Sequence, residues 1–102
     1  GDFIRTAANT GAEDDPNLDN IGVNKDIYDA YLEGYLSTAT FLTELEKSLL
    51  PYGCKRMSFM QAVRFYIDYL NGDTYYKIAY PEHNLVRTKA QIRLFEEQRK
   101  CL

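Results

Sequence analysis

The chain has 102 residues, of which 45% are hydrophobic and 26% are charged, and its formal net charge is -3 at pH 7. These values are typical of one ordinary globular domain, not of a disordered or multidomain protein. Nucleic acids and anionic membranes attract clustered Lys and Arg, so the mildly acidic balance predicts neither partner. No apolar run approaches the roughly 20 residues that span a bilayer.

The first part of the chain predicts a short helix and an acidic loop. Its opening, Gly1-Asp2-Phe3, is typical of the middle of a folded segment, although Gly1 is equally compatible with a cloning remnant. Residues 3–8 favour a short helix, which Asn9-Thr10-Gly11 ends. Residues 10–23 form an acidic loop in this interpretation, because Glu13-Asp14-Asp15-Pro16 suits a solvated segment.

Two helix starts follow. Apolar residues recur in pairs every fourth position from Ile27 to Leu36, and Asn24 precedes them as an N-cap. Thr43 and Glu46 have the spacing of a capping box, which predicts a helix from there to about Tyr52.

Pro51 and Gly53 predict a kink or break, followed by a further helix over 58–70. That helix is apolar almost all round, which is expected of a helix at the centre of a domain. Five tyrosines are assigned to the core because they recur at helical spacing: Tyr28, Tyr31, Tyr35, Tyr66 and Tyr69.

The end of the central helix and the last helix complete the expected fold. Asn71-Gly72-Asp73 suits a left-handed helix cap, and residues 75–80 are ambiguous between strand and extended loop. Helical spacing returns over 84–100. We therefore predict a single all-α domain over residues 1–102, with about five helical segments and no sheet.

One polar stripe interrupts the central helix. Gln61, Arg64, Asp68 and Asn71 recur at intervals of three and four, so they share one helix face. From spacing alone, the favoured reading is an exposed intrahelical pair of Arg64 and Asp68. The alternative is a cleft in which Arg64 donates hydrogen bonds to a ligand and Tyr75 folds back beside it.

Other residues point to little chemistry. Phosphate-loop, zinc-protease, serine-hydrolase and protein-kinase motifs are absent, and the acidic run does not fit a calcium loop, so we predict no metal site. We assign His83 to hydrogen bonding at a helix start. Cys54 and Cys101 are far apart, which argues against a disulfide scaffold and predicts a cytoplasmic protein.

A family resemblance spans nearly the whole chain. Three segments carry it: Gly1-Asp2-Phe3-Ile4-Arg5-Thr6, the stretch from Arg64-Phe65 through Asp68-Tyr69-Leu70-Asn71-Gly72-Asp73 to Tyr75, and Pro81-Glu82-His83-Asn84-Leu85-Val86-Arg87. Together they resemble the C-terminal part of bacterial N-acetylhexosamine 1-kinases, which belong to the aminoglycoside phosphotransferase-like superfamily. The resemblance implies the helical C-terminal lobe of a protein-kinase-like fold.

That resemblance implies a role in binding. In the family, the catalytic and magnesium-binding aspartates precede the segment that matches residues 1–6, so the resemblance implies that this chain holds no catalytic residue and no cofactor. The family's sugar-contacting arginine and tyrosine match Arg64 and Tyr75. The implied parent uses ATP and magnesium to phosphorylate the anomeric hydroxyl of an N-acetylhexosamine, and the partners implied here are that sugar and an N-terminal kinase lobe.

Phosphoryl transfer depends on positioned groups and metal ions, so we expect the chain alone to be inactive.

Two other readings remain. Some relatives carry a mucin-desulfating label, but Lys55-Arg56-Met57-Ser58 after Cys54 does not fit the Cys/Ser-x-Pro-x-Arg motif of sulfatases. The second reading is a free-standing helical protein-interaction module. A lobe separated from a covering domain would expose an apolar patch, so self-association of the fragment is also expected.

Overall fold

The structure is a computed structural model that describes residues 2–102, with side chains from Arg5 onward. Gly1 and the side chains of the opening Asp2-Phe3-Ile4 segment lie outside the described residues. The described chain forms five α-helices and one short 3-10 helix: α1 (Asp2–Ala7), η1 (Leu18–Asn20), α2 (Lys25–Thr38), α3 (Glu44–Ser48), α4 (Leu50–Leu70) and α5 (His83–Cys101).

The predicted all-α fold is confirmed over this range, where pairing of extended backbone is limited to an isolated bridge between Asn9 and Val23.

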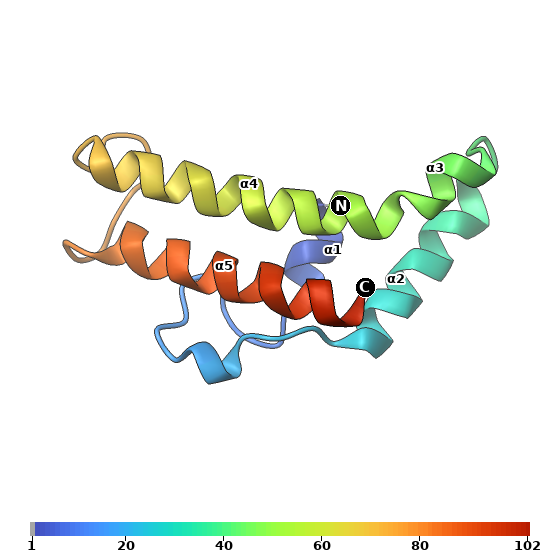
Figure 1. The fold of residues 1–102 in the computed structure, drawn as a ribbon, viewed down its shortest axis with the longest axis horizontal. Coiled ribbons are helices and arrows are strands. Elements are labelled where there is room, and N and C mark those ends of the chain that lie inside the picture. The colour runs from blue at the N-terminus through green and yellow to red at the C-terminus, as the bar shows by residue number, and fades with distance from the viewer. Residues whose placement is uncertain (1) are drawn as a thin grey trace.

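The two long helices α4 and α5 form an antiparallel hairpin that lies along the long axis of the molecule, with α2 and α3 beyond the end of α5 (Figure 1). The molecule measures 45 × 25 × 20 Å along its principal axes. Helix α1 lies behind α4 in Figure 1 and contacts both α4 and α2, and α3 lies at one end, between α2 and α4. Residues 74–82 close the other end of the hairpin as an irregular loop.

The helix starts at Asn24 and Thr43 are confirmed. The Asn24 side chain accepts a hydrogen bond from the amide of Ile27, 3.1 Å away, and caps α2. The Thr43 hydroxyl accepts a hydrogen bond from the amide of Glu46, also at 3.1 Å, and caps α3. The return contact differs from a capping box, because the Thr43 hydroxyl itself donates to the Glu46 carboxylate at 3.1 Å.

The predicted position of the break before the central helix is wrong. The chain breaks at Leu49, and α4 runs unbroken from Leu50 to Leu70 with Pro51 in its first turn. Proline is tolerated there because the first amides of a helix have no intrahelical partner. A Cβ on Gly53 would meet nothing within 4 Å, so the glycine marks no close approach.

The end of α4 confirms the predicted left-handed cap. Gly72 has φ 87° and Asp73 has φ 61°. The Gly72 amide donates to the Tyr69 carbonyl at 3.3 Å, and the Asp73 amide donates to the Asp68 carbonyl at 2.8 Å. These two bonds define a Schellman motif, which turns the chain sharply toward α5.

The packing between α4 and α5 is unusually polar. Ser58 donates to the Gln98 side chain at 2.8 Å, and the Gln98 amide donates to the Cys54 sulfur at 3.2 Å. Nearer the loop, the Asn84 amide donates to the Asp68 carboxylate at 2.7 Å. Small apolar clusters complete the interior: Ala8 with Tyr28 and Cys54, and Ile21 with Ala90 and Leu94.

The central position predicted for α4 is wrong for one of its faces. The side facing away from α5 exposes Val63, Tyr66, Ile67 and Leu70, whose exposed fractions run from 39% to 65%. Among the tyrosines assigned to the core, Tyr28 is buried and Tyr69 is half-buried, but Tyr31, Tyr35 and Tyr66 are exposed. On the inner side, Ser58 and Asp68 are buried beside Cys54, Ala62 and Phe65, and α5 supplies hydrogen-bond partners for the two polar side chains.

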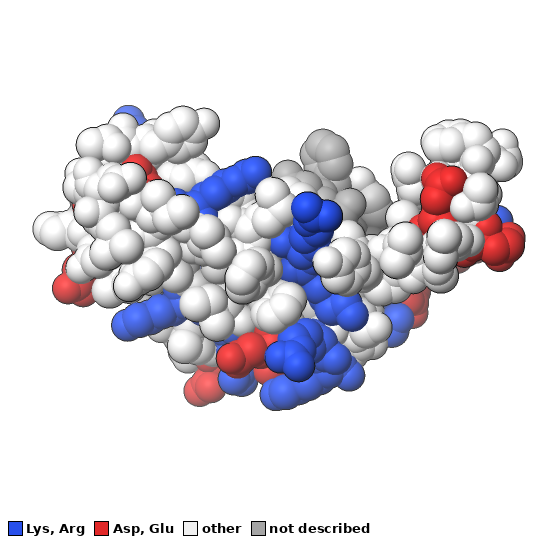
Figure 2. All heavy atoms as spheres, turned by 45° about the horizontal axis from the view of Figure 1, so that its top comes forward, with Lys and Arg blue, Asp and Glu red and all other residues white. Residues whose placement is uncertain are grey.

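Charge is unevenly spread over the surface. Figure 2 shows Lys and Arg gathered around the middle of one face, whereas Asp and Glu are spread more widely, with one group at the end where α3 lies, on the right in both views. In the described part of the chain, no helix combines the length and hydropathy needed to cross a bilayer.

Candidate functional site

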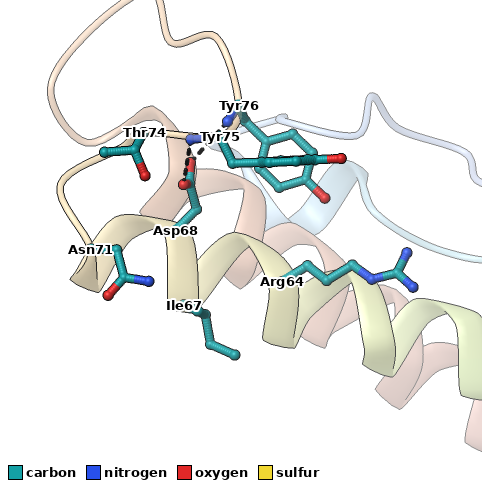
Figure 3. A pocket seen from close by; sticks show the side chains of 7 residues that line it. All are labelled: Arg64, Ile67, Asp68, Asn71, Thr74, Tyr75 and Tyr76. Carbon is teal, nitrogen blue, oxygen red and sulfur yellow. Dashed lines mark hydrogen bonds between the residues drawn. The ribbon is translucent and has the colours of Figure 1, made fainter.

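An open hollow of about 560 Å³ lies where α4 ends and the following loop folds back over it (Figure 3). Three side chains of α4, its C-cap residue and three residues of the loop line it: Arg64, Ile67, Asp68, Asn71, Thr74, Tyr75 and Tyr76. The hollow therefore brings Arg64 and Tyr75 together, with two further members of the predicted polar stripe. Gln61 does not line it.

Asp68 fixes the loop that forms one wall of the hollow. Its carboxylate accepts hydrogen bonds from the Tyr75 amide at 2.7 Å, the Tyr76 amide at 3.1 Å and the Asn84 side chain at 2.7 Å. Burial raises the pKa of the Asp68 carboxyl, but these hydrogen bonds outweigh it, so the pKa lies below its usual value. Asp68 is therefore an ionised anchor for the loop.

The favoured reading of Arg64 and Asp68 as an intrahelical pair is wrong. No ion pair joins Arg64 to another residue among those whose side chains are described, and its side chain is exposed at the rim. Figure 3 shows it extending away from Asp68, on the side to which the hydroxyl ends of Tyr75 and Tyr76 point. Its guanidinium donors are thus available to a ligand in the hollow.

A ladder of aromatic rings supports the loop. Tyr76 packs on Phe65 with ring centroids 4.8 Å apart, and Tyr75 meets Tyr76 edge-on at 4.9 Å. Burial raises the pKa of the Tyr76 hydroxyl, although the positive charge of Arg64 partly opposes the rise. Tyr75, at the outer end, is 82% exposed, so it presents a ring face and a hydroxyl beside the hollow.

His83 acts at a helix start, as the sequence predicts. It is the first residue of α5, and its Nδ1 accepts a hydrogen bond from the Ala79 amide at 3.1 Å. Its Nε2 lies 2.7 Å from the Asp14 carboxylate, to which it donates. This hydrogen bond lowers the pKa of Asp14. His83, which is 7% exposed, therefore links the acidic loop to residues 74–82, the loop that lines one side of the hollow.

Asn84 is the supporting residue that periodicity does not single out. It is fully buried, donates to Asp68 and to Asp73, and accepts a hydrogen bond from Arg87 at 2.9 Å. No spacing within α5 marks Asn84, because the carboxylates to which it donates belong to α4 and to the loop that follows α4. Its only sequence signal is its place in the segment Pro81 to Arg87 that carries the family resemblance.

The arrangement can bind a polar ligand without acting on it. Arg64 offers several donors, Asn71 offers a donor and an acceptor, and Tyr75 offers an aromatic face with a hydroxyl. The carboxylate in the hollow is committed to the loop amides, so it is poorly placed to take a proton from a ligand. The nearest thiol, that of Cys54, lies in the interior, where burial raises its pKa to about 11.

No family model matches the chain.

Proposed function

We propose that this chain forms one wall of the sugar site of an ATP-dependent sugar kinase, as the C-terminal helical lobe of that enzyme. The observation that carries the proposal is the shared hollow of Arg64 and Tyr75. The two residues are those that the family resemblance assigns to the sugar, and they come from different elements. A third residue, Asp68, holds the loop that brings them together.

The chemistry of the hollow suits a neutral sugar. A hexosamine presents hydroxyl groups, which both donate and accept, and an apolar ring face. Arg64 and Asn71 supply hydrogen-bonding groups at the rim, and the exposed ring of Tyr75 supplies a surface for the sugar's C–H groups. An N-acetylhexosamine is the proposed substrate, with phosphorylation at its anomeric hydroxyl.

ATP and magnesium belong to the proposed reaction but find no fitting site in the described residues. No group of three His, Cys, Asp or Glu side chains gathers there to hold a metal ion. Asp68 is bound to loop amides and Asp14 to His83, so their oxygens are already engaged. We derive no step through the metal or the nucleotide from this chain, and we propose that an N-terminal lobe supplies both.

Ligand-observed NMR tests the sugar site. Saturation-transfer experiments on the chain with N-acetylglucosamine or N-acetylgalactosamine are expected to show transfer to the sugar. Arg64→Ala and Tyr75→Ala are expected to reduce it at least fivefold. Matched controls are Arg56→Ala and Tyr52→Ala, exposed residues of α4 that lie outside this hollow and should leave the transfer unchanged. No transfer, or transfer that survives both site variants, would contradict the proposal.

Kinetics of a longer protein that contains this lobe give a second test. Arg64→Ala is expected to raise the KM for the sugar or to lower kcat/KM, with the KM for ATP unchanged. The chain by itself is expected to hydrolyse no ATP in a sugar-dependent way, and measurable turnover would contradict that expectation.

The second candidate function is a helical protein-interaction module. The exposed apolar side chains of α4 favour it, because monomeric proteins rarely leave such a stripe uncovered. This function predicts that the Arg64 and Tyr75 variants leave binding of a protein partner unchanged, whereas substitutions on the apolar face of α4 abolish that binding.

A further inference from the structure

A second hollow lies on α4 near its start, at the other end of the helix from the Arg64 hollow. It has a volume of about 380 Å³ and lies between α4 and α5. Its apolar residues are Tyr52, Phe59 and Phe95, and its rim carries Lys55, Arg56 and Arg99. The Phe59 and Phe95 rings are 5.7 Å apart, and the Arg99 guanidinium lies 5.9 Å from the Phe95 ring centroid. We call this feature the basic groove.

A protruding surface of opposite charge lies around α3. Phe41 is 76% exposed, Leu45 is 70% exposed and Leu49 is 51% exposed, and the three are spaced four residues apart. Glu44 stands beside them with its side chain 92% exposed, in a surface ion pair with Lys47 at 3.3 Å that a partner's cations would have to displace or share. We call these four residues the α3 knob. Among the large aliphatic and phenylalanine side chains from Arg5 onward, Phe41 is the most exposed and Leu45 the second most exposed.

The knob and the groove complement each other in apolar character and charge. The knob presents apolar side chains next to a carboxylate, and the groove presents aromatic side chains next to three cations. They cannot meet within one chain, because α3 runs directly into α4 and lies beyond the end of the groove (Figure 1). A second copy can supply the knob.

We propose that two copies of this chain associate through reciprocal docking of the α3 knob of each into the basic groove of the other. The α3 knob ends at Leu49, and the basic groove begins at Tyr52, so the two features lie on either side of Leu50. A two-fold axis that passes close to Leu50 would therefore allow both knob–groove contacts of the dimer to form at once. Such an interface buries the exposed apolar side chains and places Glu44 of each copy against Lys55 and Arg56 of the other. The Arg64 hollow stays open, since it lies at the far end of α4.

Sedimentation equilibrium tests the association. The chain is expected to dimerise reversibly, and Phe41→Ser is expected to raise the dimer Kd at least tenfold. Phe41 is so exposed that its loss should leave the fold of the monomer intact, which circular dichroism checks. Leu70→Ser is the matched control, because Leu70 is 65% exposed but lies at the opposite end of α4, and it should leave Kd unchanged.

A charge exchange shows whether the partner is another copy in this geometry. Glu44→Lys and Arg56→Glu are each expected to weaken self-association at least tenfold. Mixed in equal amounts, the two variants should recover a heterodimer, because both reciprocal contacts then pair a lysine or arginine with a glutamate. The proposal is overturned if the chain stays monomeric at millimolar concentration, if mixing restores nothing, or if Leu70→Ser weakens the dimer as much as Phe41→Ser.

Discussion

The two faces of α4 do not separate polar from apolar residues as those of an ordinary amphipathic helix do. The face toward α5 buries Ser58 and Asp68 beside Ala62 and Phe65, whereas the outer face exposes Val63 by 39% and Leu70 by 65%. The buried polar groups are satisfied by partners far along the chain, such as Gln98 and Asn84. Directional polar contacts therefore set the register of the hairpin, and the apolar surface is left for other partners.

The difference between the two faces of α4 follows from the free-energy cost of burying polar groups. A buried polar group without a partner costs about 1 to 3 kcal/mol, so Ser58 and Asp68 each favour one particular position of α5. An exposed leucine or phenylalanine carries no comparable positional demand. Substitutions on the inner face are thus expected to alter folding, and those on the outer face to alter association.

The largest expected effect comes from Asn84→Ala. The change removes donors to Asp68 and Asp73 and leaves a buried carboxylate short of one partner. We expect a loss of about 3 kcal/mol in the free energy of unfolding, measured by urea denaturation. The exposed Asn17 is the control: its side chain accepts a hydrogen bond from the Asp19 amide and caps η1, so Asn17→Ala should cost only about 1 kcal/mol. A loss as small at Asn84 as at Asn17 would show that the buried network contributes little.

Acidification comes next, since it weakens the same network without removing an atom. The pKa values of Asp68 and Asp14 are lowered in the folded chain, so both carboxylates stabilise it above their unfolded value of about 4. That stability is expected to fall as the pH drops from about 4 through the folded values. Asp68→Asn should be less stable than the unaltered chain at neutral pH and show a shallower acid dependence, whereas the exposed Asp26→Asn should keep the full dependence.

A smaller effect is expected from Ser58→Ala. The serine is fully buried and donates to Gln98 at 2.8 Å. Its loss leaves the Gln98 oxygen without that donor and should cost about 1 to 2 kcal/mol by thermal or urea unfolding. Ser48→Ala, at an exposed position of α3, should cost at most about 0.5 kcal/mol. Equal costs at the two serines would remove the distinction between inner and outer positions.

The smallest effect is expected on the outer face. Leu70→Ser replaces an exposed leucine near the end of α4 and should change the free energy of unfolding by less than about 1 kcal/mol. A loss of several kcal/mol in dilute solution would mean that Leu70 is packed in the monomer, contrary to its exposure.

Local signals in the sequence predicted the helix ends well. The caps at Asn24 and Thr43 and the left-handed turn at Gly72 depend on residues within a few positions of each other, so periodicity and turn chemistry suffice. Pro51 was harder to interpret, because the same residue both ends a helix and starts one. The structure places it at a start.

The choice of inner face could not be predicted from the sequence. Residues 58–70 are apolar nearly all round, so hydropathy does not distinguish the side that packs on α5. The decision depends on hydrogen bonds between residues 16 to 40 positions apart, such as Asp68 with Asn84 and Ser58 with Gln98. For the candidate site, spacing placed Arg64 and Asp68 on one face but did not reveal that Asp68 anchors the loop carrying Tyr75.

Solvent accessibility of side chains on α4 and α5 tests most directly whether polar contacts are buried between the two helices while apolar side chains of α4 face solvent. A soluble gadolinium chelate added to the dilute, monomeric chain would relax NMR signals according to their exposure. We expect strong relaxation of the methyl groups of Val63, Ile67 and Leu70, together with protected side-chain amide protons of Asn84 and Gln98. Protected methyl groups and strongly relaxed amides would contradict the account.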